Sequence, residues 1–157
     1  MGLAGTVGGG TPSDLEEASP ELAREVLVRC LGDFPQVQLT VTGACMAPAL
    51  RPGDVVTLVS PAHRRPRPGD IVLFAVPDGF RLHRLLWAPA AGGWRTKADS
   101  APTWDAASSR ADIIATARDV RSGAGVRGTR SATRLLRSWV EVAAAHVRAA
   151  WRSRHRG

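Results

Sequence analysis

Polar and apolar residues alternate in the part of the chain that follows Gln36. Val37, Leu39 and Val41 occupy every second position, which is the period of a half-buried β-strand. Three further runs rich in valine and isoleucine have the length of strands, at residues 55–59, 71–76 and 113–120. Short strands joined by turns predict a mainly β domain, built as an antiparallel sheet or a small, partly open barrel.

Helical periodicity is found on both sides of this β-rich region. Ser19 is a favourable N-cap and Pro20 suits a first helical turn, so we expect a helix to begin there. Its apolar face is predicted to contain Leu22, Val26, Leu27, Cys30 and Leu31, with Cys30 as a buried, inert thiol. Residues 129–156 predict a second helix, basic and amphipathic. The apolar side of that helix is expected to hold Leu135, Leu136, Trp139, Val140, Ala143, Val147, Ala150 and Trp151.

The tetrapeptide Arg-Pro-Gly-Asp occurs twice, at residues 51–54 and 67–70, each time directly before a run rich in valine or isoleucine. Proline presets the second position of a turn, and glycine accepts a positive φ at the third. Each copy therefore predicts a type II turn that leads into a strand.

The chain length of 157 residues suits one domain with terminal extensions. Residues 1–12 (MGLAGTVGGGTP) are Gly-rich and are expected to be disordered, because they have little apolar surface to bury. We expect residues 13–122 to form the β domain with its leading helix, and residues 123–157 to form a basic helical tail.

The net charge of +7 is concentrated in this tail. Residues 124–157 contain eight arginines and a single acidic residue, Glu141, whereas the other 123 residues have 13 basic and 13 acidic side chains. A basic surface confined to one tail does not favour nucleic-acid binding, so no nucleic-acid partner is expected. The tail helix is instead expected to contact a membrane surface or a protein partner, or to pack back on its own domain.

The two cysteines, Cys30 and Cys45, form neither a disulfide framework nor a zinc motif, and no metal or cofactor is expected. No apolar run reaches the roughly 18 residues of a membrane span, and residues 1–11 lack the basic start and apolar stretch of a secretory signal. The expected location is the cytoplasm, either free or peripheral to the membrane.

Residues 42–54 read TGACMAPALRPGD and contain the most informative motif of the chain. They resemble the signal-peptidase signature, in which Gly, any residue, Ser, Met, any residue, Pro, a small residue and Leu precede a Gly-Asp turn. Cys45 occupies the position of the nucleophilic serine. Six residues match directly: Gly43, Met46, Pro48, Leu50, Gly53 and Asp54.

Three more segments follow in the order found in that family. Residues 69–74 (GDIVLF) resemble the next box, residues 82–85 (LHRL) resemble the box with the general base, and residues 96–99 (TKAD), with Asp105 beyond them, resemble the last box. Four ordered segments are far more specific than one. The resemblance implies the superfamily of signal peptidases and self-cleaving repressor peptidases, with its small antiparallel β domain.

The general base implied by the resemblance is a histidine. Bacterial signal peptidases use a lysine, but the only lysine here, Lys97, lies in the last segment. The base position holds His83, as in the archaeal and endoplasmic-reticulum branch, which combines histidine with acidic partners. An imidazole suits proton transfer from a thiol. The implied catalytic residues are therefore Cys45 and His83, with Asp99 and Asp105 both candidates for orienting the ring.

The resemblance also implies the reaction and the substrate. A soluble endopeptidase of this type would cleave an extended peptide through a thioester at Cys45, whose backbone N–H would contribute to the oxyanion hole. The peptide would lie beside residues 37–42. The candidate substrate-binding residues are Gly43, Ala44, Met46 and Pro48.

Three other functions compete with this hypothesis. A catalytically inactive module of the same fold would bind peptides without cleaving them. A thiol transpeptidase would use the reactivity of thioesters toward amines. A self-cleaving transcriptional repressor is disfavoured, because residues 1–35 offer one helix where a helix-turn-helix reader needs two.

Overall fold

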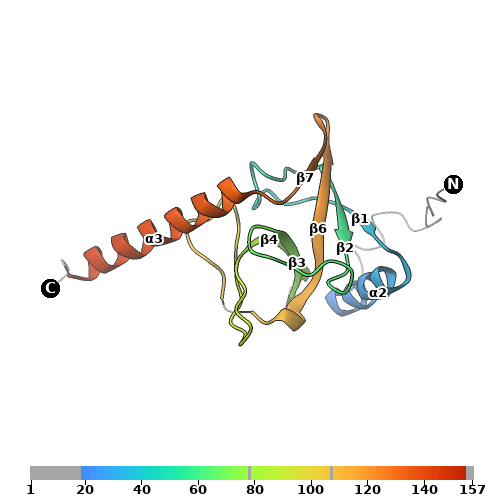
Figure 1. Cartoon of the computed structure of the whole chain (residues 1–157), viewed down its shortest axis with the longest axis horizontal. Coiled ribbons are helices and arrows are strands. Elements are labelled where there is room, and N and C mark those ends of the chain that lie inside the picture. The colour runs from blue at the N-terminus through green and yellow to red at the C-terminus, as the bar shows by residue number, and fades with distance from the viewer. Residues whose placement is uncertain (1–18, 78, 107, 155–157) are drawn as a thin grey trace.

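The computed structural model describes residues 19–77, 79–106 and 108–154, and its ribbon is shown in Figure 1. The Gly-rich segment 1–12, predicted to be disordered, lies outside these ranges, as does the end of the predicted tail at 155–157. No helix within the described ranges combines the length and the apolar character needed to cross a membrane.

One antiparallel sheet forms the centre of the molecule. Its strands are β1 (Val37–Thr40), β2 (Val55–Val59), β3 (Ile71–Val76), β4 (Gly79–Trp87), β5 (Arg95–Lys97), β6 (Ile113–Ser122) and β7 (Gly125–Gly128). They lie in the order β1-β2-β6-β3-β4-β5, and β7 pairs with the second half of β6. No pairing among the described residues joins β1 to β5, so the sheet is open. The predicted mainly β, antiparallel class is confirmed.

The sequence predicted four of these strands, β1, β2, β3 and β6, and missed β4, β5 and β7. In β4 the charged or polar residues Arg81, His83 and Arg84 interrupt the apolar pattern. His83 and Arg84 are nevertheless only 6% and 0% exposed. A strand whose buried positions carry charged groups has no hydrophobic period from which it can be recognised. The predicted tail, 123–157, also begins with a strand rather than with helix, because β7 extends the sheet.

Apolar side chains pack on both faces of the sheet. β3 contributes to both, because successive side chains of a strand point to opposite faces, and this explains its continuous apolar run. Ile71 and Leu73 belong to the larger core, which also includes residues of β1, β2, β6, α2 and the loop between β1 and β2. The smaller core on the other face comprises Val72, Phe74, Leu85, Trp94 and Ile113.

Helix α2 (Pro20–Asp33) begins as predicted, since the side chain of Ser19 accepts a hydrogen bond from the backbone N–H of Leu22. Its predicted apolar face is only partly correct. Leu31 is buried, whereas Leu22 and Val26 are 52% and 40% exposed and Cys30 is half-buried rather than buried. The helix meets the core through Leu27 and Leu31, and Glu21 and Arg24 of its first turns line a cavity against the end of β3 and the start of β4.

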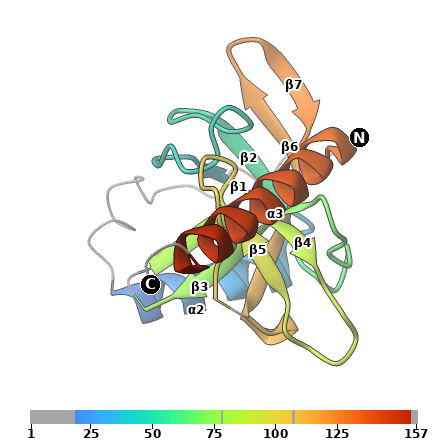
Figure 2. The same ribbon diagram turned by 90° about the vertical axis from the view of Figure 1, so that its left-hand side faces the viewer.

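Helix α3 (Ala132–Arg154) confirms the predicted C-terminal helix, but its orientation differs from the expected one. Ser138 and Val142 are its buried residues within the described part of the chain, whereas Leu136, Val140 and Val147 are more than 60% exposed. In Figure 2 the helix crosses in front of β4 and β5, and in Figure 1 its second half extends away from the sheet. The inner face of the helix therefore combines Ser138 and Val142 with Trp139, which packs edge-on against Trp104, whereas much of the predicted apolar side faces outward.

The two Arg-Pro-Gly-Asp turns have the predicted conformation. Gly53 and Gly69 have φ values of 89° and 94°, which l-residues with a side chain rarely adopt. In each turn the last N–H donates to the first carbonyl at 3.0 Å. The carboxylates of Asp54 and Asp70 also accept from the backbone N–H of the first arginine at 2.9 Å. Both turns are thereby fixed at the starts of β2 and β3.

Candidate functional site

Cys45 lies in the loop between β1 and β2, which is closed at its base. The N–H of Val41 donates to the carbonyl of Asp54, and the N–H of Gly53 donates to the carbonyl of Val41, both at 2.8 Å. Met46 and Leu50, each 1% exposed, anchor the loop in the larger core. Because Cys45 directly precedes an anchored residue, it is held in a defined place while it remains exposed.

A second loop, after β5, fastens the Cys45 peptide from the other side. The carbonyl of Cys45 accepts hydrogen bonds from the N–H and the hydroxyl of Ser100, at 3.1 and 2.8 Å. The N–H of Asp99 donates to the sulfur of Met46 at 3.4 Å. Segments more than fifty residues apart in sequence are thereby joined at the candidate nucleophile.

Strand β4 passes beside the thiol at the residue next to His83. The Sγ atom of Cys45 lies 3.9 Å from the carbonyl oxygen of Leu82, the residue that precedes His83. His83 is 6% exposed, and its ring packs edge-on against Phe74, with ring centroids 5.6 Å apart. The ring is therefore held rigidly by the smaller core.

Asp105 orients this ring. Its Oδ2 atom lies 2.7 Å from Nδ1 of His83 and accepts a second hydrogen bond, at 2.6 Å, from the hydroxyl of Thr96. The backbone N–H of Asp105 donates to the carbonyl of Thr96 at 2.8 Å, which fixes the position of the carboxylate. An ionised carboxylate only accepts, so the proton lies on Nδ1 and leaves Nε2 free to act as a base.

Asp99, the other acidic candidate, has a different partner. Both of its carboxylate oxygens accept hydrogen bonds from the guanidinium group of Arg84, at 2.8 and 2.7 Å. Arg84 is fully buried and also donates to the carbonyl of Gly69 at 2.7 Å. A buried guanidinium needs a carboxylate to compensate its charge. Asp99 therefore compensates the charge of the buried Arg84, and of the two candidates it is Asp105 that bonds the His83 ring.

The surroundings shift the pKa values of Cys45 and Asp105 in opposite directions. Burial raises the pKa of the Cys45 thiol, and the carboxylate of Asp105 adds to this effect. Hydrogen bonds from the N–H groups of Cys45 and Met46, together with the charge of Arg81, oppose the rise without cancelling it. The thiol is therefore protonated near neutral pH and needs a base when it reacts.

The pKa of Asp105 is lowered. Burial alone would raise it, but hydrogen bonds from His83 and Thr96 and the charges of His83 and Arg81 outweigh that cost. The carboxylate is therefore ionised near neutral pH. This is the form that can orient the imidazole and stabilise an imidazolium ion.

The four candidate substrate-binding residues divide into two groups. Gly43, Ala44 and Pro48 are exposed and belong to the same loop as the thiol. Met46 is buried, so its side chain supports the loop and is not available for contact with a substrate.

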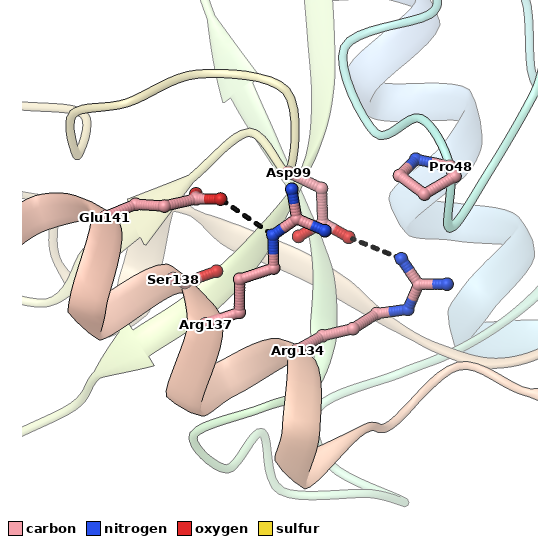
Figure 3. A pocket seen from close by; sticks show the side chains of 6 residues that line it. All are labelled: Pro48, Asp99, Arg134, Arg137, Ser138 and Glu141. Carbon is pink, nitrogen blue, oxygen red and sulfur yellow. Dashed lines mark hydrogen bonds and ion pairs between the residues drawn. The ribbon is translucent and has the colours of Figure 1, made fainter.

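Pro48 also lines a narrow cavity at which α3 reaches the site. Figure 3 shows Arg134, Arg137, Ser138 and Glu141 of α3 opposite Asp99 and Pro48. The cavity measures about 10 Å³ and has room for about one water molecule. It is therefore a seam between the helix and the loop, with no space for a ligand.

Three contributors to the site were not found from the sequence: Arg81, Thr96 and Ser100. Arg81 lies two residues before His83 on β4, on the same face of the strand, so the period of a strand would have indicated it if β4 had been recognised. Thr96 and Ser100 each act through two hydrogen bonds to one residue of the site, Asp105 and Cys45 respectively, and such bonds leave no pattern in the sequence.

Among the described residues, no group of three or more His, Cys, Asp or Glu side chains is arranged to hold a metal ion. Comparison with known proteins adds no family, since no family model and no curated protein matches the chain.

Proposed function

We propose that this chain is a cysteine endopeptidase of the signal-peptidase type, with Cys45 as nucleophile, His83 as general base and Asp105 as the residue that orients the base. The observation that carries the proposal is the 2.7 Å hydrogen bond between His83 Nδ1 and Asp105. His83 lies on β4, and the carbonyl of the preceding residue, Leu82, contacts the Cys45 thiol. Acyl transfer requires a thiol and an oriented imidazole in one site, and here the thiol contacts the residue that precedes the oriented histidine.

The proposed reaction proceeds in two steps. His83 Nε2 takes the proton of Cys45 as the sulfur attacks the carbonyl carbon of the peptide bond. The tetrahedral intermediate collapses to a thioester, and the departing amine takes the proton from His83. Water then attacks the thioester with His83 again as base, which releases the acid and restores the thiol. The N–H groups of Cys45 and Met46, which lower the pKa of the thiol, are the candidate oxyanion donors.

The open strand edges beside the thiol support an extended peptide as the substrate. β5 pairs with β4 only along Arg84–Trp87, so Gly79–His83 has no strand partner on that side among the described residues. β1, which leads into the Cys45 loop, is an edge strand of the sheet. A peptide that pairs with these edges would place its carbonyl group beside the thiol through main-chain hydrogen bonds.

The proposal is tested by incubating the protein with a library of unstructured peptides and identifying the products by mass spectrometry. We expect new termini in the parent protein and in Cys30→Ala, which removes the other thiol, but none in Cys45→Ala or His83→Ala. Hydroxylamine should convert the trapped thioester to a peptide hydroxamate. Products that persist in Cys45→Ala would overturn the proposal.

A peptide-binding module without catalysis is the second candidate, and the raised pKa of Cys45 favours it, because a protonated thiol is a poor nucleophile. In that case the same library would yield no new termini, and peptides would be retained equally by the parent protein and by Cys45→Ala.

A further inference from the structure

An apolar stripe runs along α3 on the side that faces away from the sheet. Leu136, Val140 and Val147 are 67%, 61% and 69% exposed. Their spacings of four and seven residues place them on one side of a helix with 3.6 residues per turn. The buried residues, Ser138 and Val142, lie on the opposite side. The stripe is therefore not part of the packing of this domain.

The charged residues of α3 are also unevenly distributed between its inner and outer sides. Glu141 is the only acidic residue of the helix, and it is turned inward. Its carboxylate bonds Nζ of the fully buried Lys97 at 2.8 Å and Nε of Arg137 at 2.8 Å. Arg137, Arg148 and Arg152 are exposed. Among the described residues of α3, the outward surface thus presents arginines and apolar groups but no carboxylate.

The geometry leaves this surface accessible along its length. From Leu136 to Val147 the stripe spans about 16 Å at 1.5 Å per residue. Figure 1 shows the second half of the helix extending beyond the sheet, and Figure 2 shows the helix on the outside of the molecule. Arg148 lies about a quarter of a turn from the stripe, where its long side chain can reach the headgroups while the stripe enters the acyl region.

We propose that the outer face of α3 binds the surface of a bilayer that contains anionic lipids, with the helix lying in the plane of the interface. Apolar burial supplies one part of the attraction, and the arginines supply the other by pairing with lipid phosphates. The binding is peripheral and independent of the peptidase activity proposed above.

Two other occupants fit the same surface less well. A second copy of the chain would bring two arginine-rich helices together, and their like charges would repel. A nucleic acid would pair with the arginines but would leave Leu136, Val140 and Val147 in contact with a highly charged polymer. A bilayer with anionic headgroups complements both the charges and the apolar stripe.

The test is co-sedimentation of the full chain with two kinds of vesicle, one of phosphatidylcholine and one of equal parts phosphatidylcholine and phosphatidylglycerol. We expect binding to the anionic vesicles that weakens as salt is added. Substitution of Leu136, Val140 and Val147 by serine should weaken it at least about tenfold. Substitution of Arg148 by glutamine should weaken it about fivefold.

The matched control is the serine substitution of Leu22, Val26 and Val28, three exposed apolar residues of α2. This variant should bind the anionic vesicles as the parent protein does, and circular dichroism should show that all variants are folded.

Three results would overturn the proposal. The first is equal binding, or no binding, to the two vesicle types. The second is a parent protein that does not bind vesicles and that sediments as a dimer, while the α3 serine variant sediments as a monomer. The third is tight binding of an oligonucleotide that the α3 serine variant retains, without any binding to vesicles.

Discussion

Replacing Asp99 by asparagine should mainly lower the stability of the protein, whereas replacing Asp105 by asparagine should mainly slow catalysis. Asp99 holds a fully buried guanidinium with two hydrogen bonds of 2.8 and 2.7 Å. Replacing it by asparagine leaves the charge of Arg84 uncompensated in the interior. Loss of one partner of a buried ion pair costs about 3–5 kcal/mol, so we expect the melting temperature to fall by roughly 10–20 °C.

Asp105→Asn should affect stability far less. The side chain of Asp105 is 28% exposed and is bonded to Thr96 and to His83, so the loss is expected to be about 1 kcal/mol. Catalysis, in contrast, depends on the tautomer and orientation of the imidazole. We expect acylation of Cys45 by a substrate peptide to slow by roughly 10²–10⁴-fold.

Both effects are measured on the same preparations, by thermal unfolding followed with circular dichroism and by mass spectrometry of the acyl-enzyme. Asp119→Asn is the matched control, because Asp119 pairs with Arg118 at the surface, where an ion pair contributes little. The reasoning is refuted if Asp105→Asn lowers the melting temperature as much as Asp99→Asn does, or if a folded Asp99→Asn protein loses acylation while Asp105→Asn retains it.

Two further predictions concern titration. The rate of iodoacetamide alkylation at Cys45, followed by mass spectrometry against pH, should titrate at higher pH in Arg81→Gln and at lower pH in Asp105→Asn, because the first charge lowers the pKa of the thiol and the second raises it. Unchanged profiles would contradict this. Glu141→Gln should destabilise the protein by about 3 kcal/mol, because it strips the buried Lys97 of its counter-charge. The pKa of Glu141 is lowered in the folded protein, so its contribution to stability is complete above the unfolded-state pKa and is lost as the pH falls through the folded-state pKa. The free energies of unfolding of the parent and the variant, measured in guanidinium, should therefore converge in acid.

Much of the fold could be predicted from the sequence, because the strands that were recognised carry their signal locally. β1 alternates, β3 is a continuous apolar run, and two Arg-Pro-Gly-Asp turns mark where β2 and β3 begin. β4 was missed because its buried positions hold His83 and Arg84, whose burial depends on partners that lie 15 to 45 residues away.

The candidate site was predictable in its members but not in their pairing. The ordered segments indicated Cys45, His83 and two acidic residues, and the sequence could not choose between Asp99 and Asp105. The choice depends on Arg84, which binds both oxygens of Asp99 from the opposite face of β4. The orientation of α3 was missed for a related reason, because its inner face includes an ion pair between Glu141 and Lys97 that the apolar pattern of the helix does not reveal.

The adjacency of His83 and Arg84 on β4 makes this strand intolerant of insertions and deletions. Successive residues of a strand point to opposite faces, so a shift of one residue exchanges everything that the two faces carry. Such a shift would turn the guanidinium toward Asp105 and the imidazole toward Asp99, and would break both partnerships at once. Length changes in the turn before β4 should therefore be tolerated only when they leave the pairing of Val72 with His83 unchanged.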